Sequence, residues 1–194
     1  MLLSCLIVIL MIVASMGFGS LGLRILGCPH APNWAENWGR CFALGIGIIG
    51  WFLFWMGIMN WLTSWMLIIL VIFGCMSFWW GKEDLRCPLF INIDWKTVLL
   101  VLGLFVSLSF DLLEALAPPA DADTLAYHFA LPKYFLTNGR IEFVPIAVQG
   151  AIPLLLHMTY TIALGLGGEM SLTLWTFTTQ LFTSLTIFGI VLVE

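Results

Sequence analysis

Charged side chains are scarce in this 194-residue chain, which has seven Lys and Arg and eleven Asp and Glu. It contains no basic cluster that could neutralise a nucleic-acid backbone, so nucleic acid is excluded as a partner. Hydrophobic residues, by contrast, make up 61% of the sequence. A soluble domain of this length does not need so much apolar surface. The composition therefore predicts an integral membrane protein with several spans.

Cysteine spacing excludes two further classes. The five cysteines form no CxxC pair and have no spacing typical of a metal site, and their odd number does not suit a disulfide framework. We therefore interpret them as buried thiols and predict no cysteine-based metal centre. They are Cys5, Cys28, Cys41, Cys75 and Cys87.

Apolar segments alternate with short groups of charges and turn residues along the chain. Each segment is close to the roughly 20 residues that a helix needs to cross a bilayer, and alternating β patterning is absent. The predicted fold is therefore all-α, a polytopic bundle of about six transmembrane helices. Residues 1–23 lack the basic start of a signal peptide, so we interpret them as a retained span. The six segments are Leu2–Leu23, Phe42–Met59, Leu62–Trp80, Thr97–Leu116, Val148–Leu166 and Met170–Val193.

Basic residues are distributed unevenly between the predicted loops. Five of the seven lie after the first and third segments, and positive loops stay in the cytoplasm. We therefore expect a multi-pass protein of the inner or plasma membrane, with its N-terminus and the loop after the fourth segment outside. This divides the chain into a three-helix region, residues 1–96, and a second region, residues 97–194, whose outer loop spans residues 117–147.

The outer loop holds a polar, aromatic stretch, residues 121–138. The pair Pro118-Pro119 ends the fourth segment, because consecutive prolines cannot continue a helix. A short amphipathic helix is predicted next, lying along the outer membrane surface, with Asn138-Gly139 as a left-handed C-cap.

The ionisable residues of this stretch have two interpretations each. Asp121 and Asp123 could cap the helix, or one could act as a general base or hold a divalent metal on a phosphate. His128 could be an ordinary polar side chain at the interface or a catalytic one. Lys133 and Arg140 could extend to lipid headgroups or bind a lipid-linked phosphate.

Four polar residues within the apolar segments add to this picture. Asp111 and Glu114 lie one helical turn apart near the outer end of the fourth segment. They are either solvent-exposed or an inward-facing acidic wall of the same site. His157 and Gln180, in the last two segments, are predicted to make interhelical hydrogen bonds.

Residues 118–140, PPADADTLAYHFALPKYFLTNGR, resemble the first outer loop of bacterial GT-C glycosyltransferases. The resemblance is to the branch similar to dolichyl-phosphate-mannose protein mannosyltransferases, glycosyltransferase family 39, and extends over about residues 97–194. It implies sugar transfer from a polyprenyl-phosphate donor on the outer face, with Asp123 as the catalytic base.

The same resemblance implies roles for neighbouring residues. Asp121 would supply the second acid, because Thr124 stands where many relatives carry one. The implied substrate-binding residues are Tyr127, His128, Lys133 and Arg140. Family members are longer than this chain, so it would supply part of such an enzyme. The alternative is a non-catalytic structural membrane subunit of a larger complex; a transporter is least supported, since no inverted repeat is apparent.

The last apolar segment is unusually rich in hydroxyl and amide side chains. Such residues hold helices together in membranes, so we expect this segment to pack against spans of another membrane protein chain or another copy. The other expected partners are membrane lipids and the lipid-linked sugar donor. The polar residues are Thr173, Thr176, Thr178, Thr179, Gln180, Thr183, Ser184 and Thr186.

Overall fold

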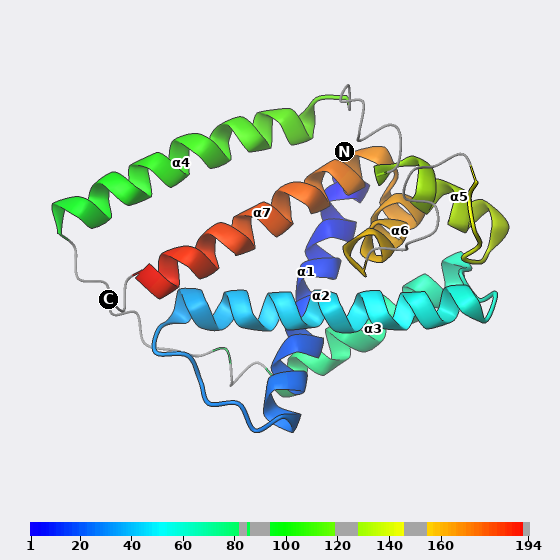
Figure 1. The fold of residues 1–194 in the computed structure, drawn as a ribbon, viewed down its shortest axis with the longest axis horizontal. Coiled ribbons are helices and arrows are strands. Elements are labelled where there is room, and N and C mark those ends of the chain that lie inside the picture. The colour runs from blue at the N-terminus through cyan, green and yellow to red at the C-terminus, as the bar shows by residue number, and fades with distance from the viewer. Residues whose placement is uncertain (82–84, 86–93, 119–127, 146–154, 192–194) are drawn as a thin grey trace.

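A computed structural model describes residues 1–81, 85, 94–118, 128–145 and 155–191. These residues form seven helices and no strand, as the predicted all-α class requires (Figure 1). The helices are α1 (Leu2–Ile25), α2 (Trp34–Ile58), α3 (Ser64–Gly81), α4 (Trp95–Leu116), α5 (Ala130–Asn138), α6 (Leu155–Gly167) and α7 (Glu169–Val191).

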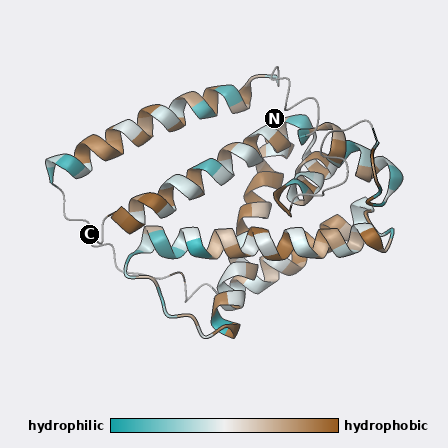
Figure 2. Ribbon diagram, viewed as in Figure 1, coloured by the Kyte–Doolittle hydropathy of each residue, from teal (hydrophilic) through white to brown (hydrophobic). Residues whose placement is uncertain are grey.

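Five of these helices, α1, α2, α3, α4 and α7, are long and apolar enough to cross a membrane. The protein is therefore membrane-embedded, as its composition predicts. Hydrophilic residues occupy the first turns of α2 and lie near both ends of α4, as Figure 2 shows. The described part of the fifth expected span is α6, which has 13 residues. At 1.5 Å per residue it measures about 20 Å, less than the roughly 30 Å of a hydrocarbon core.

Hydrogen bonds between distant segments define one end of the bundle, here called the basic end. The Arg24 guanidinium donates to the carbonyl of Trp80, which joins the last turns of α1 and α3. The Asn33 amide donates to the carbonyl of Gly189, which joins the start of α2 to the last turns of α7. Three of the basic residues lie in helices that begin or end here: Arg24 in the last turn of α1, Arg40 early in α2 and Lys96 in the first turn of α4. In Figure 1 the end of α1 lies at the bottom of the view, and the starts of α2 and α4 lie at its left.

The opposite end, here called the α5 end, is defined in the same way. It holds the start of α1, the α2–α3 turn, the last turns of α4, α5 and the α6–α7 turn, at the upper right of Figure 1. The bonds that join them are Ser4 Oγ to Gly167 O, Leu62 N to Gly139 O, and Thr173 Oγ1 to Ala115 O.

The direction of α7 departs from the expected topology. Because the α6–α7 turn lies at the α5 end, α7 runs from there to the basic end. Leu2 and Val191 therefore lie at opposite ends, whereas six crossings would leave them at the same end. Leu155 lies against Gly50, about two turns before α2 ends, so α6 starts inside the bundle and ends at the α5 end.

The apolar character of α6 has a different cause from the one the sequence indicates. Residues 157–163 of α6 are all buried within the protein. A short apolar helix is more often a core or re-entrant helix than a span. Hydropathy measures removal from water, and burial against α5 and α7 removes these side chains from water as effectively as lipid does.

The orientation of the bundle in the membrane is testable with cysteine labelling. We expect the basic end in the cytoplasm and the α5 end outside. In a background that retains Cys28 alone, an impermeant maleimide should label intact cells only when the exposed Asn138 is replaced by Cys. Cys28 is exposed at the basic end, so its interpretation as a buried thiol was wrong, and it should react only after permeabilisation. Labelling of Cys28 in intact cells would reverse the orientation.

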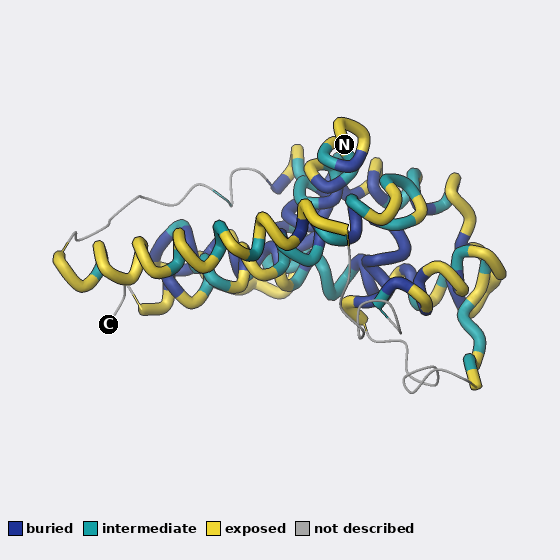
Figure 3. The backbone as a smooth tube through the Cα atoms, turned by 90° about the horizontal axis from the view of Figure 1, so that it is seen from above, coloured by how far each residue is buried: buried dark blue, intermediate teal, exposed yellow. Residues whose placement is uncertain are grey.

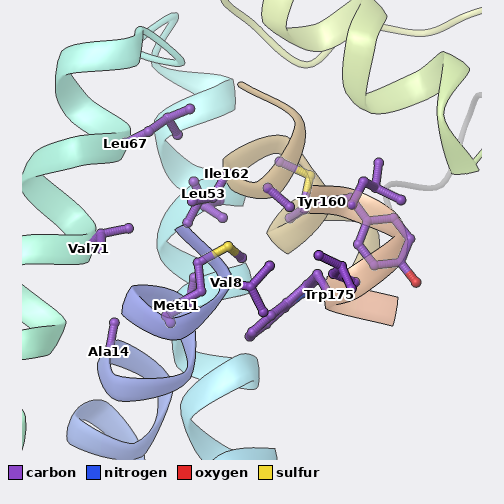
Figure 4. Packing of buried hydrophobic residues seen from close by; sticks show 14 of the residues in the cluster. Val8, Met11, Ala14, Leu53, Leu67, Val71, Tyr160, Ile162 and Trp175 are labelled. Atoms are coloured by element: carbon purple, nitrogen blue, oxygen red, sulfur yellow. The ribbon is translucent and has the colours of Figure 1, made fainter. Parts of the chain in front are cut away.

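Close backbone contact between α1, α2 and α3 forms the first half of the core. Gly19 of α1 lies directly against the carbonyl of Cys41, and Gly45 of α2 lies against that of Ser15. Small residues allow such approach, which replaces the missing hydrophobic effect in lipid with dispersion contacts. Figure 4 shows Met11, Leu53 and other residues of this region packed together with Trp175.

The two regions expected from the sequence share this core. Both α6 and α7 pack against α1 and α2. Trp175 of α7 is fully buried, and its indole N–H donates to the Thr159 hydroxyl at 2.8 Å. The indole is thus satisfied inside the protein, as a buried tryptophan requires.

The helix α4 is peripheral. Ala115 is its one buried residue, and its main packing partner is α7. Figure 3 shows most of α4 as exposed.

The helix α5 lies within the stretch for which the sequence predicts an amphipathic outer-loop helix, and the earlier part of that stretch, residues 119–127, is outside the described residues. Pro132 lies in the first turn of α5, where its missing N–H costs no helical bond. Gly139 has φ +67° and ends the helix, which confirms the predicted left-handed C-cap. Leu131, Pro132 and Phe135 are buried, and α5 packs against α6.

Candidate functional site

A cavity of about 340 Å³ lies at the α5 end between α4 and α7, and is called the α4–α7 pocket here. Carboxylate, imidazole, hydroxyl and amide groups line it together with three aromatic rings. Its polar residues are Asp111, Glu114, His128, Thr173, Thr176 and Gln180, and its aromatic ones are Phe129, Tyr160 and Phe177.

The helix α4 supplies the acidic wall of the pocket. Asp111, Glu114 and Ala115 are three and four residues apart, so they share one helical face. The carbonyl of Ala115 accepts a hydrogen bond of 2.7 Å from the Thr173 hydroxyl, which holds this face against α7. Asp111 is half-buried and Glu114 exposed, and both line the pocket. Their position in the pocket lining fits the inward-facing interpretation, and the exposure of Glu114 also fits the solvent-exposed one.

His128, paired with a second histidine behind it, contributes a second wall. His128, just before α5, shares a hydrogen bond between its Nδ1 and Nε2 of His157, from α6. Their rings stack with centroids 4.7 Å apart, and Tyr160 meets the His157 ring edge-on at 5.3 Å. A single N–H between two imidazoles requires one of them to be neutral. His157, which is buried, thereby sets the position of the His128 ring at the pocket.

Three of the predicted site residues, Asp121, Asp123 and Tyr127, lie outside the described residues. The nearest described residues on either side, Pro118 and His128, both line the α4–α7 pocket.

The two predicted phosphate-binding cations do not line the pocket. Lys133 lies in a separate cavity of about 550 Å³ beside α5, together with Glu169. Arg140 pairs with Glu142 at 2.7 Å. The structure thus brings His128 to the acidic wall and leaves Lys133 and Arg140 apart from it.

Glu142 is a residue that sequence reasoning missed. Its carboxylate accepts hydrogen bonds from the Tyr134 hydroxyl at 2.7 Å and the Asn138 amide at 2.8 Å, in addition to Arg140. The bond from Tyr134, then the Arg140 charge, lower the pKa of Glu142, although desolvation opposes them. The bond to Glu142 also raises the pKa of the Tyr134 hydroxyl. This cluster secures the last turn of α5, and no spacing rule identifies it.

A groove of about 510 Å³ continues from the pocket between α2 and α7. Asp111 and Gln180 line both cavities, so the polar pocket and the groove meet at these two residues. Beyond them the groove wall includes Phe42, Ile46 and Phe182.

The hydroxyl-rich helix α7 can lie next to this groove because its threonine hydroxyls are hydrogen-bonded within the helix itself. These hydroxyls donate to carbonyls three or four residues earlier in α7 at 2.7–3.1 Å. Such bonds satisfy each hydroxyl within its own helix. The threonines therefore do not by themselves require a partner chain. These residues are Thr176, Thr178, Thr179, Thr183 and Thr186.

A metal site is not apparent in the described part of the chain, where no three His, Cys, Asp or Glu residues lie close enough to hold an ion. Asp121 and Asp123 are outside that part, so their metal-binding interpretation stays a prediction. Gln180 lines the pocket, and its interhelical hydrogen bond stays a prediction. His157 bonds to His128, just before α5.

Comparison of the chain with family models, curated proteins and solved structures found no match.

Proposed function

We propose that this chain carries part of a membrane transferase site that handles a sugar bound to a polyprenyl phosphate at the α5 end. The observation that carries the proposal is the α4–α7 pocket, where Asp111, Glu114 and His128 meet. Carboxylates and amides bind sugar hydroxyls well, because each oxygen accepts and each N–H donates. The aromatic rings of the pocket provide apolar surface for a sugar face.

The resemblance of residues 118–140 to GT-C glycosyltransferases supports the same proposal. In this proposal Asp123 acts as general base on the acceptor hydroxyl, and Asp121 assists it. His128 contacts the substrate, held in place by His157. The isoprenoid part of the donor is apolar and long, so it requires an opening to lipid. The groove between α2 and α7 supports that requirement because it meets the pocket at Asp111 and Gln180.

The proposed role of the pocket can be tested by replacing Asp111. Asp94, the N-cap residue of the same helix, provides the matched control. The test uses membranes of the source cell that carry each variant in place of the wild type, and measures sugar transfer from a polyprenyl-phosphate donor. Asp111→Asn should lower transfer about 10- to 100-fold, the loss typical of one hydrogen bond to a charged group. Asp94→Asn should have no effect.

Asp94 is a suitable control because it lies at the basic end and caps α4 through Thr97 at 2.8 Å. The hydrogen bond from the Thr97 hydroxyl, and then the one from the Thr97 N–H, lower the pKa of Asp94. Asn is an equally good cap, so the fold is preserved. Unchanged transfer in Asp111→Asn would show that the pocket takes no part in the reaction.

A second candidate function is a structural membrane subunit, and the exposure of α4 favours it. A helix with one buried residue and one main neighbour presents most of its surface to lipid or to another protein. In that case neither Asp111→Asn nor Asp94→Asn would affect transfer, but deletion of the chain would reduce the recovery of its partner.

A further inference from the structure

The cavity of about 550 Å³ beside α5 has a chemistry of its own, and it is called the α5 cavity here. It shares Phe129 with the α4–α7 pocket but contains none of that pocket's polar residues, so it is a separate site from the one proposed to handle the sugar. The residues that give it character come from the start of α5, from α5 itself, from α6 and from the first position of α7. They are Phe129, Lys133, Leu136, Thr137, Leu164 and Glu169.

Packing of α5 against α6 builds the apolar part of the α5 cavity. Phe129 is buried, and Leu136 of α5 and Leu164 of α6 are partly buried against the core. A Cβ at Gly165 of α6 would come within 3.1 Å of the Leu136 side chain, so the two helices approach each other closely. The apolar lining is therefore held by two helices that belong to the core, and the cavity is an integral part of the fold.

Two side chains of opposite charge complete the lining. Lys133 supplies an ammonium from α5, and Glu169, the first residue of α7, supplies a carboxylate. They are the charged members among the described residues that line the cavity, and both are exposed. No ion pair joins these two side chains to each other within the described part of the chain. The cavity thus presents a cation and an anion at separate places and not a neutralised pair.

Two separated charges of opposite sign indicate a zwitterionic ligand. A lysine ammonium binds phosphate as a point charge, and a carboxylate accepts hydrogen bonds from a primary ammonium. A phosphoethanolamine group carries a phosphate and a primary ammonium on a short linker, so it can meet Lys133 and Glu169 at once. A purely anionic headgroup would be repelled by Glu169, and a choline group has no N–H to donate to it. The volume of the cavity is within the range of about 300–1,000 Å³ that is typical of small-ligand sites.

The depth of the cavity indicates that this group belongs to a lipid. The N–H of Leu62 donates to the carbonyl of Gly139 at 3.1 Å, which joins the end of α5 to the α2–α3 turn. Trp61 in that turn and Trp65 in the first turn of α3 are 55% and 76% exposed, as expected for aromatic side chains at the membrane interface. Headgroups lie at this depth. We propose that the α5 cavity binds the headgroup of phosphatidylethanolamine from the leaflet at the α5 end.

Lipid-dependent stabilisation of the purified full chain tests the proposal. Phosphatidylethanolamine, phosphatidylglycerol and phosphatidylcholine with the same acyl chains are titrated separately into the protein in mild detergent, and the unfolding temperature is measured. Phosphatidylethanolamine should raise it at a half-saturating concentration about tenfold lower than either other lipid, since one charge-assisted hydrogen bond distinguishes them. Equal half-saturating concentrations for the three lipids would overturn the proposal. Equal stabilisation by free phosphoethanolamine would exclude a lipid as the source of the group.

Two substitutions separate the roles of the two charges. Lys133→Gln should increase the half-saturating phosphatidylethanolamine concentration about tenfold, because the charge on the phosphate is lost. Glu169→Gln should weaken phosphatidylethanolamine binding as much and strengthen phosphatidylglycerol binding, because it removes a repulsion, so the preference between these lipids should disappear. Both positions are exposed, so the fold is preserved. A Glu169→Gln variant that keeps the preference would contradict the proposal.

Lys96→Gln is the matched control for the change of charge. Lys96 is exposed at the basic end and does not line the α5 cavity, so its variant should respond to phosphatidylethanolamine as the wild type does. Thr137→Trp, at an exposed position of the lining, should fill the cavity and weaken binding without removing either charge. Equal weakening by Lys96→Gln and Lys133→Gln would mean general electrostatic attraction and overturn the proposal, as would a normal response of Thr137→Trp.

Discussion

Replacing Asp123 by Asn should lower sugar transfer about 10²–10⁴-fold, the contribution typical of a general base. An asparagine amide cannot accept the proton of an attacking hydroxyl, although it has almost the same size and shape as the carboxylate. It also caps helices as well as aspartate does. A loss of activity in this variant therefore reports chemistry and not helix stability. The measurement is transfer from a polyprenyl-phosphate sugar in membranes of the source cell, at equal protein levels.

Asp121→Asn is the matched variant for this experiment. It lies two residues from Asp123 and makes the same change of charge, so it shares any general electrostatic effect. We expect a smaller loss from it, because the resemblance implies an assisting role for Asp121. Small and equal effects of the two variants would favour the interpretation of both aspartates as helix caps.

Replacing Gly19 by Val should disrupt the packing of α1 against α2. A Cβ at this position would overlap the carbonyl oxygen of Cys41, and backbone atoms cannot move aside as a flexible side chain can. Overpacking of a well-packed core typically costs about 1–3 kcal/mol, and a backbone clash lies at the upper end of that range or beyond it. We expect a clearly lower unfolding temperature in detergent and a smaller monodisperse fraction in gel filtration.

Gly103→Val is the control for this change. Gly103 is also in the middle of a membrane helix, but a Cβ there would have no neighbour within 4 Å. The same substitution should therefore leave the unfolding temperature nearly unchanged. If Gly103→Val lowered it as much as Gly19→Val, the effect would come from valine in a membrane helix and not from the contact of α1 with α2.

The sequence alone determined the class of this protein and most of its helices. Charge scarcity and apolar length predict membrane helices because lipid imposes the same requirement on every span. The C-cap at Gly139 was equally predictable, since a left-handed residue after a helix is a local preference of glycine. For α6, apolar length was insufficient to distinguish a membrane span from a buried helix. Its apolar residues face other helices, and hydropathy does not distinguish protein from lipid as their surroundings.

The candidate site depended much more on tertiary structure. Asp111 and Glu114 were identifiable as unusual acids, but whether they faced solvent or a cavity depended on the packing of α4 against α7. His128 and His157 are 29 residues apart in the sequence, and no spacing rule connects them. Lys133 and Arg140, grouped with the site as possible phosphate-binding cations and by the family resemblance, do not line the pocket, because Arg140 pairs with Glu142 and Lys133 lines another cavity beside α5. Local preferences act over one or two helical turns, whereas a pocket forms where helices from distant parts of the chain meet.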